Sequence, residues 1–257
     1  MLGLSLVGIS TTAFASLDEC IKAGASKYDN SENIIKYCKP FEKKNIQGSG
    51  ILLDAYVAED EDKKALDLSL WVIKNFSKEK TPYLTSSQRN KVYTNTLGAI
   101  GDIYYFGGKD VPINKKLGMK YTVQAAELGN AIAQNQLGEF YNSPEDFPGL
   151  NGAISYKWYM LAIENGSSPA RSSALIKDID FTTKQGPLCI AMGKQLLAEA
   201  YIDGKGVSVN KARAERYLRG AIVLYKNNKV TEDSFKYCPT GADKLNLASA
   251  EKELDSL

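Results

Sequence analysis

The sequence predicts an all-α protein, an α-solenoid of stacked antiparallel helix hairpins. Three observations predict this class. All eight prolines fall between apolar-periodic segments, as expected for helices joined by short loops, because proline disrupts a helix interior. Runs with the alternating pattern of β-strands are rare. A motif of an apolar residue, a small residue and a tyrosine recurs along the chain, which indicates a repeat array.

The composition limits the function. With 44% hydrophobic and 24% charged residues, the chain of 257 residues is typical of a folded protein. A net charge of +2 gives no indication of nucleic-acid binding. The absence of histidine excludes Ser-His-Asp and Cys-His nucleophile systems and zinc sites with histidine ligands. We expect no cofactor, no nucleic-acid partner and no enzyme activity.

The first 15 residues, MLGLSLVGISTTAFA, are apolar and small, and they end in Ala13-Phe14-Ala15 before a polar segment. This pattern is typical of a signal peptide cleaved after Ala15, although the usual basic start is missing. A buried N-terminal helix is the alternative. No other segment is apolar over the length that a membrane span needs. We therefore expect an exported, periplasmic protein without membrane insertion.

Four cysteines, none in a CxxC pair, suit an oxidising compartment. Three pairings are possible. Proximity along the chain favours Cys20 with Cys38 and Cys189 with Cys238. Four free thiols would be expected only without export.

Two regions follow the predicted signal peptide. Residues 16–94 are predicted to be a helical region in which Leu53-Asp54-Ala55-Tyr56 resembles a degenerate repeat. Residues 95–257 hold three clearer units, an insertion and a C-terminal helix. The units begin at Ile100, Leu137 and Leu197, and each has a tyrosine four residues later: Tyr104, Tyr141 and Tyr201. A second aromatic and an alanine follow in each unit: Tyr121 and Ala125, Trp158 and Ala162, Tyr217 and Ala221.

Hairpin packing explains this spacing. A small residue in the first helix lets the second helix approach closely, and the aromatics fill the space between hairpins. Because one hairpin cannot cover its own apolar face, neighbours must stack. Gly107 and Gly204 are placed to end the first helix, and Asn114 and Asn210 to cap the second.

The stretch YIDGKGVSVNKARAERYL, residues 201–218, places Gly204 and Gly206 on either side of a lysine. Glycine-rich loops of this kind can bind phosphate. A P-loop, however, needs four residues between its first glycine and the Gly-Lys-Ser/Thr element. Since Gly107 recurs at the same repeat position, we interpret these glycines as turn residues.

The pattern L-G-x-x-Y-x-x-G-x-G-V, followed by an aromatic and A-A-E-x-G, resembles the Sel1-like repeat, a relative of the tetratricopeptide repeat. The resemblance covers about residues 95 to 225. Leu117-Gly118 departs from the usual Lys-Ala, and the unit from Leu137 lacks its loop glycines. The step from Tyr141 to Tyr201 is 60 residues, which predicts an inserted segment near 170–186.

This resemblance implies a scaffold or adaptor, often of bacterial envelopes. Some similar proteins are immunity proteins that neutralise secreted toxins. A cysteine-rich subgroup is linked to β-lactam binding, but it has a disulfide in each repeat and this chain does not.

The residue two positions before each repeat tyrosine, including that of the degenerate unit, is acidic. Helical spacing places the residues six before and one after on the same face. By resemblance to tetratricopeptide arrays, this face would be concave and would bind a partner with a basic or amide-rich segment. Solvated helix positions are the alternative. The predicted partner-binding residues are Asp54, Asp102, Tyr105, Asn135, Glu139, Asn142, Gln195 and Glu199.

The main hypothesis is thus a non-catalytic periplasmic scaffold that binds another protein. One alternative is an immunity protein against a secreted lipase or cell-wall hydrolase. Another is a cell-wall hydrolase that uses carboxylates such as Asp102 and Glu139. Aromatics off the repeat pattern are further contact candidates or core residues: Phe106, Phe140, Tyr156 and Tyr159. The sequence leaves the partner and the oligomeric state open.

Overall fold

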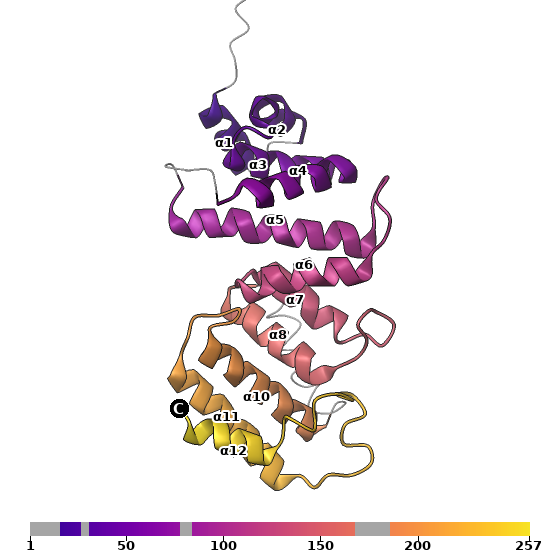
Figure 1. Ribbon diagram of the computed structural model, residues 1–257, viewed down its shortest axis with the longest axis vertical. Coiled ribbons are helices and arrows are strands. Elements are labelled where there is room, and N and C mark those ends of the chain that lie inside the picture. Colours follow the sequence, from indigo (N-terminus) through magenta and orange to yellow (C-terminus); the bar gives the residue numbers. More distant parts are fainter. Residues whose placement is uncertain (1–15, 27–30, 78–83, 168–185) are drawn as a thin grey trace, which may run out of the picture. The chain divides into compact units, whose positions relative to one another are not determined.

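The computed structural model describes residues 16–26, 31–77, 84–167 and 186–257. Within those ranges the regular elements are eleven α-helices and one short 3-10 helix, which confirms the all-α prediction (Figure 1). The chain divides into two compact units, residues 1–83 and 84–257. The predicted signal peptide lies outside the described residues, and so does all but the last residue of the predicted insertion. No helix in the described ranges combines the length and the apolar character needed to cross a membrane.

The described part of the first unit contains four α-helices and the 3-10 helix. Ser16 starts the first of them with a capping box, in which its hydroxyl accepts from the backbone of Glu19. Cys20 and Cys38 form a disulfide with a Cα–Cα distance of 4.8 Å, as predicted, and both are fully buried. The elements are α1 (Leu17–Ala25), α2 (Ser31–Cys38), η1 (Lys39–Phe41), α3 (Ile46–Ala58) and α4 (Asp62–Asn75).

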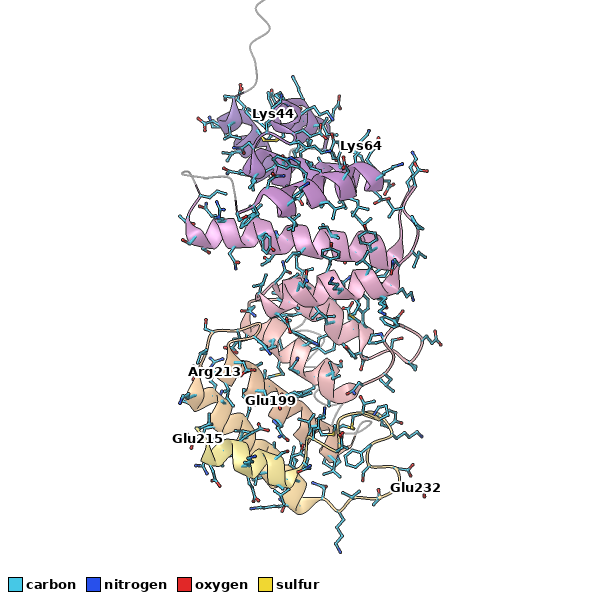
Figure 2. All side chains as sticks on the ribbon, in the orientation of Figure 1. Lys44, Lys64, Glu199, Arg213, Glu215 and Glu232 are labelled. Carbon is cyan, nitrogen blue, oxygen red and sulfur yellow. A yellow bond between two sulfur atoms is a disulfide. The ribbon has the colours of Figure 1, made fainter. Side chains whose placement is uncertain are left out.

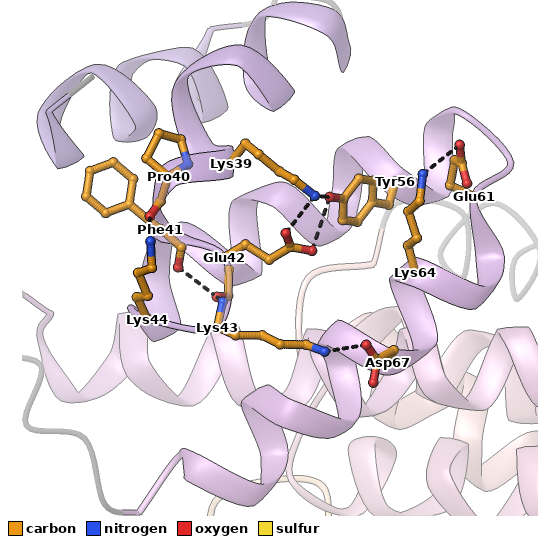
Figure 3. Close-up of polar contacts among 11 residues, drawn as sticks. Lys39, Pro40, Phe41, Glu42, Lys43, Lys44, Tyr56, Glu61, Lys64 and Asp67 are labelled. Carbon is orange, nitrogen blue, oxygen red and sulfur yellow. Dashed lines mark hydrogen bonds and ion pairs between the residues drawn. The ribbon is translucent and has the colours of Figure 1, made fainter. Parts of the chain in front are cut away.

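Polar contacts hold η1 against α3 in this unit (Figure 3). The Lys39 ammonium donates to the Tyr56 hydroxyl at 2.5 Å and forms an ion pair with Glu42 at 2.6 Å. The Tyr56 hydroxyl in turn donates to Glu42 at 3.2 Å. The hydrogen bond to Glu42 is the main reason that the pKa of Lys39 is raised. Lys43, just after η1, pairs with Asp67 on α4.

The second unit is a stack of helical hairpins. α5 packs on α6, α7 on α8 and α10 on α11, while α6 contacts α7, α8 contacts α10 and α11 contacts α12. Each hairpin therefore covers part of the next. The helices are α5 (Ser86–Phe106), α6 (Lys115–Glu127), α7 (Ala131–Phe140), α8 (Gly152–Glu164), α10 (Pro187–Asp203), α11 (Lys211–Asn227) and α12 (Leu247–Asp255).

Small residues let the paired helices approach as predicted. A Cβ atom on Gly118 would lie 2.6 Å from the Tyr105 nitrogen and 2.7 Å from the Gly101 oxygen. The Leu117-Gly118 departure from the repeat pattern thus gives α6 its own close contact with α5. The repeat aromatics stack within two hairpins, Tyr104 on Tyr121 and Tyr201 on Tyr217.

The predicted helix ends are confirmed. Asn114 and Asn210 accept from the backbone of α6 and α11, and Gly107 and Gly204 end α5 and α10 with positive φ. Two further asparagines, Asn130 and Asn151, cap α7 and α8 in the same way.

Gly206 belongs to a buried polar network rather than a phosphate loop. Its N–H donates to the Glu127 carbonyl at 2.7 Å. Its carbonyl accepts from the side-chain amides of Gln134 and Asn165, each at 2.7 Å. Gly206 has φ of 80°, and a Cβ atom would lie 2.9 Å from the Ala126 oxygen, so glycine is required here. These contacts join the ends of α6 and α8, and α7 between them, to the turn after α10, and so connect all three hairpins.

The second disulfide, Cys189–Cys238, is also as predicted, with a Cα–Cα distance of 5.7 Å. It links α10 to the irregular segment 228–246 that precedes α12. Met192 and Leu245 pack with it in a buried cluster. This link fixes the segment 239–245 beside α10.

Candidate partner-binding site

Three of the four predicted acidic residues lie on the first helices of successive hairpins in the second unit. Asp102 is on α5, Glu139 on α7 and Glu199 on α10. Asp54 is an exposed residue of α3 in the first unit and stays a predicted partner-binding residue. We call Asp102, Glu139 and Glu199, together with Asn135 on α7, the acidic row.

Asp102 links two hairpins. The Gln136 side chain on α7 donates to its carboxylate at 2.6 Å. Burial raises the pKa of Asp102, and the hydrogen bond from Gln136 opposes part of that rise. Keeping the Asp102 carboxylate ionised in this half-buried position therefore costs free energy.

Asn135 and Glu139 are neighbours on α7. The Asn135 amide donates to the exposed Glu139 carboxylate at 2.9 Å. The Asn135 side-chain oxygen is buried and accepts no hydrogen bond from the described residues. A buried acceptor without a donor is costly, so this oxygen marks a place where a donor from another molecule would stabilise the surface.

Glu199 lies among other charged groups. Its pKa is raised first by burial and then by the charge of Glu253, while Lys157 lowers it to a smaller extent. Burial also lowers the pKa of Lys157 to about 8. Across the described ranges, no donor forms a hydrogen bond or ion pair with the Glu199 carboxylate.

Two of the predicted partner-binding residues are buried rather than exposed. Tyr105 is 1% exposed, because its ring stacks on Phe140 and its hydroxyl donates to the Phe147 carbonyl at 2.7 Å. Gln195 is fully buried, because its amide donates to Ser249 and Glu253 of α12. The helical spacing was right for both, but neighbouring elements cover them.

The remaining candidates divide by exposure. Asn142 is half-buried just after α7, and its N–H donates to the Glu139 carbonyl. Phe106 is 60% exposed and stays a contact candidate. The other off-pattern aromatics are core residues: Phe140, Tyr156 and Tyr159.

A cavity of about 270 Å³ lies beside Glu199, between α8, α10 and the segment 240–245. Its lining includes Ile154, Leu196, Glu199, Thr240, Lys244 and Leu245. The sequence did not indicate this cavity, because helical periodicity does not give the path of the irregular segment 240–245. The predicted Cys189–Cys238 pairing was the available signal, since it brings the segment after Cys238 next to α10.

The described residues contain no group of three or more His, Cys, Asp or Glu side chains that could hold a metal ion.

Comparison with protein families gives one match. The Sel1 repeat model matches residues 97–130, 131–167 and 191–221, which are the three hairpin units predicted from the tyrosine spacing. The chain thus contains three Sel1 repeats. Helices α3 and α4 lie outside the matched ranges, so the degenerate fourth unit stays a prediction. No curated protein matches the chain.

Two solved structures are similar. A Sel1 repeat protein from Oxalobacter formigenes is 18% identical with a TM-score of 0.43; the match covers 84% of this chain and 53% of that one. A protective antigen present in uropathogenic Escherichia coli strains, which displays an SLR fold, is 16% identical with a TM-score of 0.33. That match covers 87% of this chain and 55% of the other. The chain therefore spans just over half the length of both.

Proposed function

We propose that this chain is a non-catalytic periplasmic scaffold that binds a partner protein along the acidic row. Sel1 repeat modules are typically protein-interaction scaffolds. The observation that carries the proposal is the buried Asn135 oxygen, which has no donor among the described residues and lies on the same helix as the Glu139 carboxylate. A basic or amide-rich segment of a partner would supply the missing donors.

The compartment follows from the cysteines. Both disulfides are formed, and no free cysteine remains in the described residues. Stable disulfides are typical of oxidising compartments outside the cytoplasm. Together with the signal-like N-terminal sequence, they support the periplasm as the site of action.

Affinity capture of the disulfide-bonded chain from periplasmic extract, with identification by mass spectrometry, tests the proposal. Glu139→Lys reverses an exposed charge on the row. It should lower the affinity for the captured partner about tenfold and make that affinity less dependent on salt. Glu232→Lys is the matched control, because Glu232 lies on the segment between α11 and α12, away from Glu199 (Figure 2). Equal binding by both variants would contradict the proposal.

The identity of the captured partner and two further assays separate the alternatives. A secreted toxin as the captured partner, with rescue of intoxicated cells by this chain, would make the scaffold an immunity protein. Incubation with peptidoglycan should release no fragments. Release that is lost in the Asp102→Asn variant would replace the scaffold with a hydrolase, since burial raises the pKa of Asp102 as a general acid requires.

A further inference from the structure

We propose that the cavity between α8, α10 and the segment 240–245 receives an arginine side chain of the partner protein, with its guanidinium on Glu199. This inference rests on the proposed scaffold function and adds the chemistry of one contact. The cavity belongs entirely to the second unit.

The size of the cavity favours a single side chain. At about 270 Å³ it is smaller than the pockets of about 300–1,000 Å³ that hold small-molecule ligands. Ile154, Leu196 and Leu245 give it apolar walls. An arginine can lay its aliphatic stem on such walls while its charged head reaches a carboxylate at the edge.

The surrounding charges favour a cation at Glu199. The charges of Glu253 and Asp203 raise the pKa of Glu199 and those of Lys157 and Lys205 lower it, and the effect of Glu253 is the largest of the four. One Glu253 oxygen is also buried and has no donor among the residues described. A cation between or beside these carboxylates would relieve their repulsion.

Arginine suits this place better than lysine. Burial disfavours the charged form of an ammonium, so a lysine placed in the cavity would lose its proton more readily than an arginine. A guanidinium keeps its charge in buried sites and can donate two parallel hydrogen bonds to one carboxylate. Lys244 also lines the cavity, but it is exposed on a flexible stem and can turn away.

Methyl NMR of the full chain can test this contact without the partner. Titration with n-butylguanidinium should give saturable shifts of the Ile154, Leu196 and Leu245 methyl groups. The neutral isostere n-butylurea and the anion valerate should give much smaller shifts at the same concentration. Equal shifts with n-butylurea would show an apolar pocket without charge selection and would overturn the proposal.

Three variants locate the charge. Glu199→Gln should weaken n-butylguanidinium binding about fivefold or more, because the half-buried ion pair is lost. Glu232→Gln, an exposed carboxylate elsewhere, should leave it unchanged. Lys244→Met removes a competing charge and should tighten binding about twofold. If Lys244→Met instead abolished valerate binding at these methyl groups, the cavity would be an anion site and the proposal would be wrong.

Failure here differs from failure of the scaffold proposal. The cavity is judged by binding of n-butylguanidinium alone, whereas the scaffold is judged by the effect of Glu139→Lys on partner capture. If partner binding depends on Glu139 but the cavity does not bind n-butylguanidinium, the scaffold proposal stands and the arginine contact is wrong.

Discussion

In the first unit the tyrosine near the end of α3 is held by charges, whereas in the second unit the tyrosines of α5 and α10 stack on other rings. Tyr56 lies between Lys39 and Lys64, with each ammonium within 6 Å of its ring centroid, and it bonds to Glu42. Tyr104 and Tyr201 face the aromatic residue of the next helix. In the Sel1 repeats ring stacking therefore adds to charge rather than replacing it, since Arg213 also donates to the Tyr201 hydroxyl at 2.9 Å and lies over its ring.

The two disulfides also differ in the elements that they join. Cys20–Cys38 joins two helices of the first unit across a separation of 18 residues. Cys189–Cys238 spans 49 residues and joins the last Sel1 hairpin to an irregular segment. No described cysteine lies between α3 and α8, where hairpins pack directly on one another. Covalent links therefore occur where the repeat pattern is weak.

Removing the disulfides one at a time should give the largest effect. In the chain-entropy model, Cys20→Ala/Cys38→Ala should cost about 3 kcal/mol and Cys189→Ala/Cys238→Ala about 4 kcal/mol. Each double variant should raise hydrogen exchange in its own unit, with α5 to α8 staying protected in both. Hydrogen exchange followed by mass spectrometry measures this. Faster exchange throughout both units after either change would show that the repeats also depend on the disulfides.

A matched pair of glycines tests packing by shape. Gly118→Ala places a Cβ atom 2.6 Å from the Tyr105 backbone and should cost about 1–3 kcal/mol, because α5 and α6 must move apart. Gly98→Ala meets no atom within 4 Å and should stabilise α5 by about 0.5–1 kcal/mol through helix propensity. Urea unfolding of both variants checks the prediction. A similar loss for both would mean that close approach is not what Gly118 provides.

Much of the fold could be predicted from the sequence because its causes are local. Asn114 and Asn210 cap helices through their own next turn, and the repeat spacing of Tyr104 and Tyr201 follows from helix geometry. The disulfide pairing followed from chain proximity. These features depend on residues close in sequence or on the repeat period.

The candidate site was less predictable because covering elements decide exposure. Gln195 has the spacing of a surface residue, yet α12 covers it from more than 50 positions away. The network at Gly206 connects the hairpins through Gln134 on α7. The repeat motif does not include this glutamine. One wall of the cavity beside Glu199 is the irregular segment 240–245. The periodicity of the sequence cannot predict the path of such a segment.

The smallest expected effect concerns Asp102, whose buried negative charge lowers the stability of the folded Sel1 unit. Burial raises the pKa of Asp102 in the folded protein, so folding favours the protonated form. Its contribution to stability is full below the unfolded pKa of about 3.9 and is lost as the pH rises through the folded pKa. Asp102→Asn stays neutral and can still accept from Gln136. It should therefore be more stable than the wild type at pH 7 and equal to it near pH 4.

Urea unfolding from pH 4 to 8 measures that difference, with Glu139→Gln as a control at an exposed carboxylate of the same row. A gain for Asp102→Asn that does not change with pH would show that ionisation is not its cause. If the gain grows with pH while partner capture weakens, the two results together assign the buried charge to binding. The unit would then retain Asp102 against its own stability because the partner supplies the opposite charge.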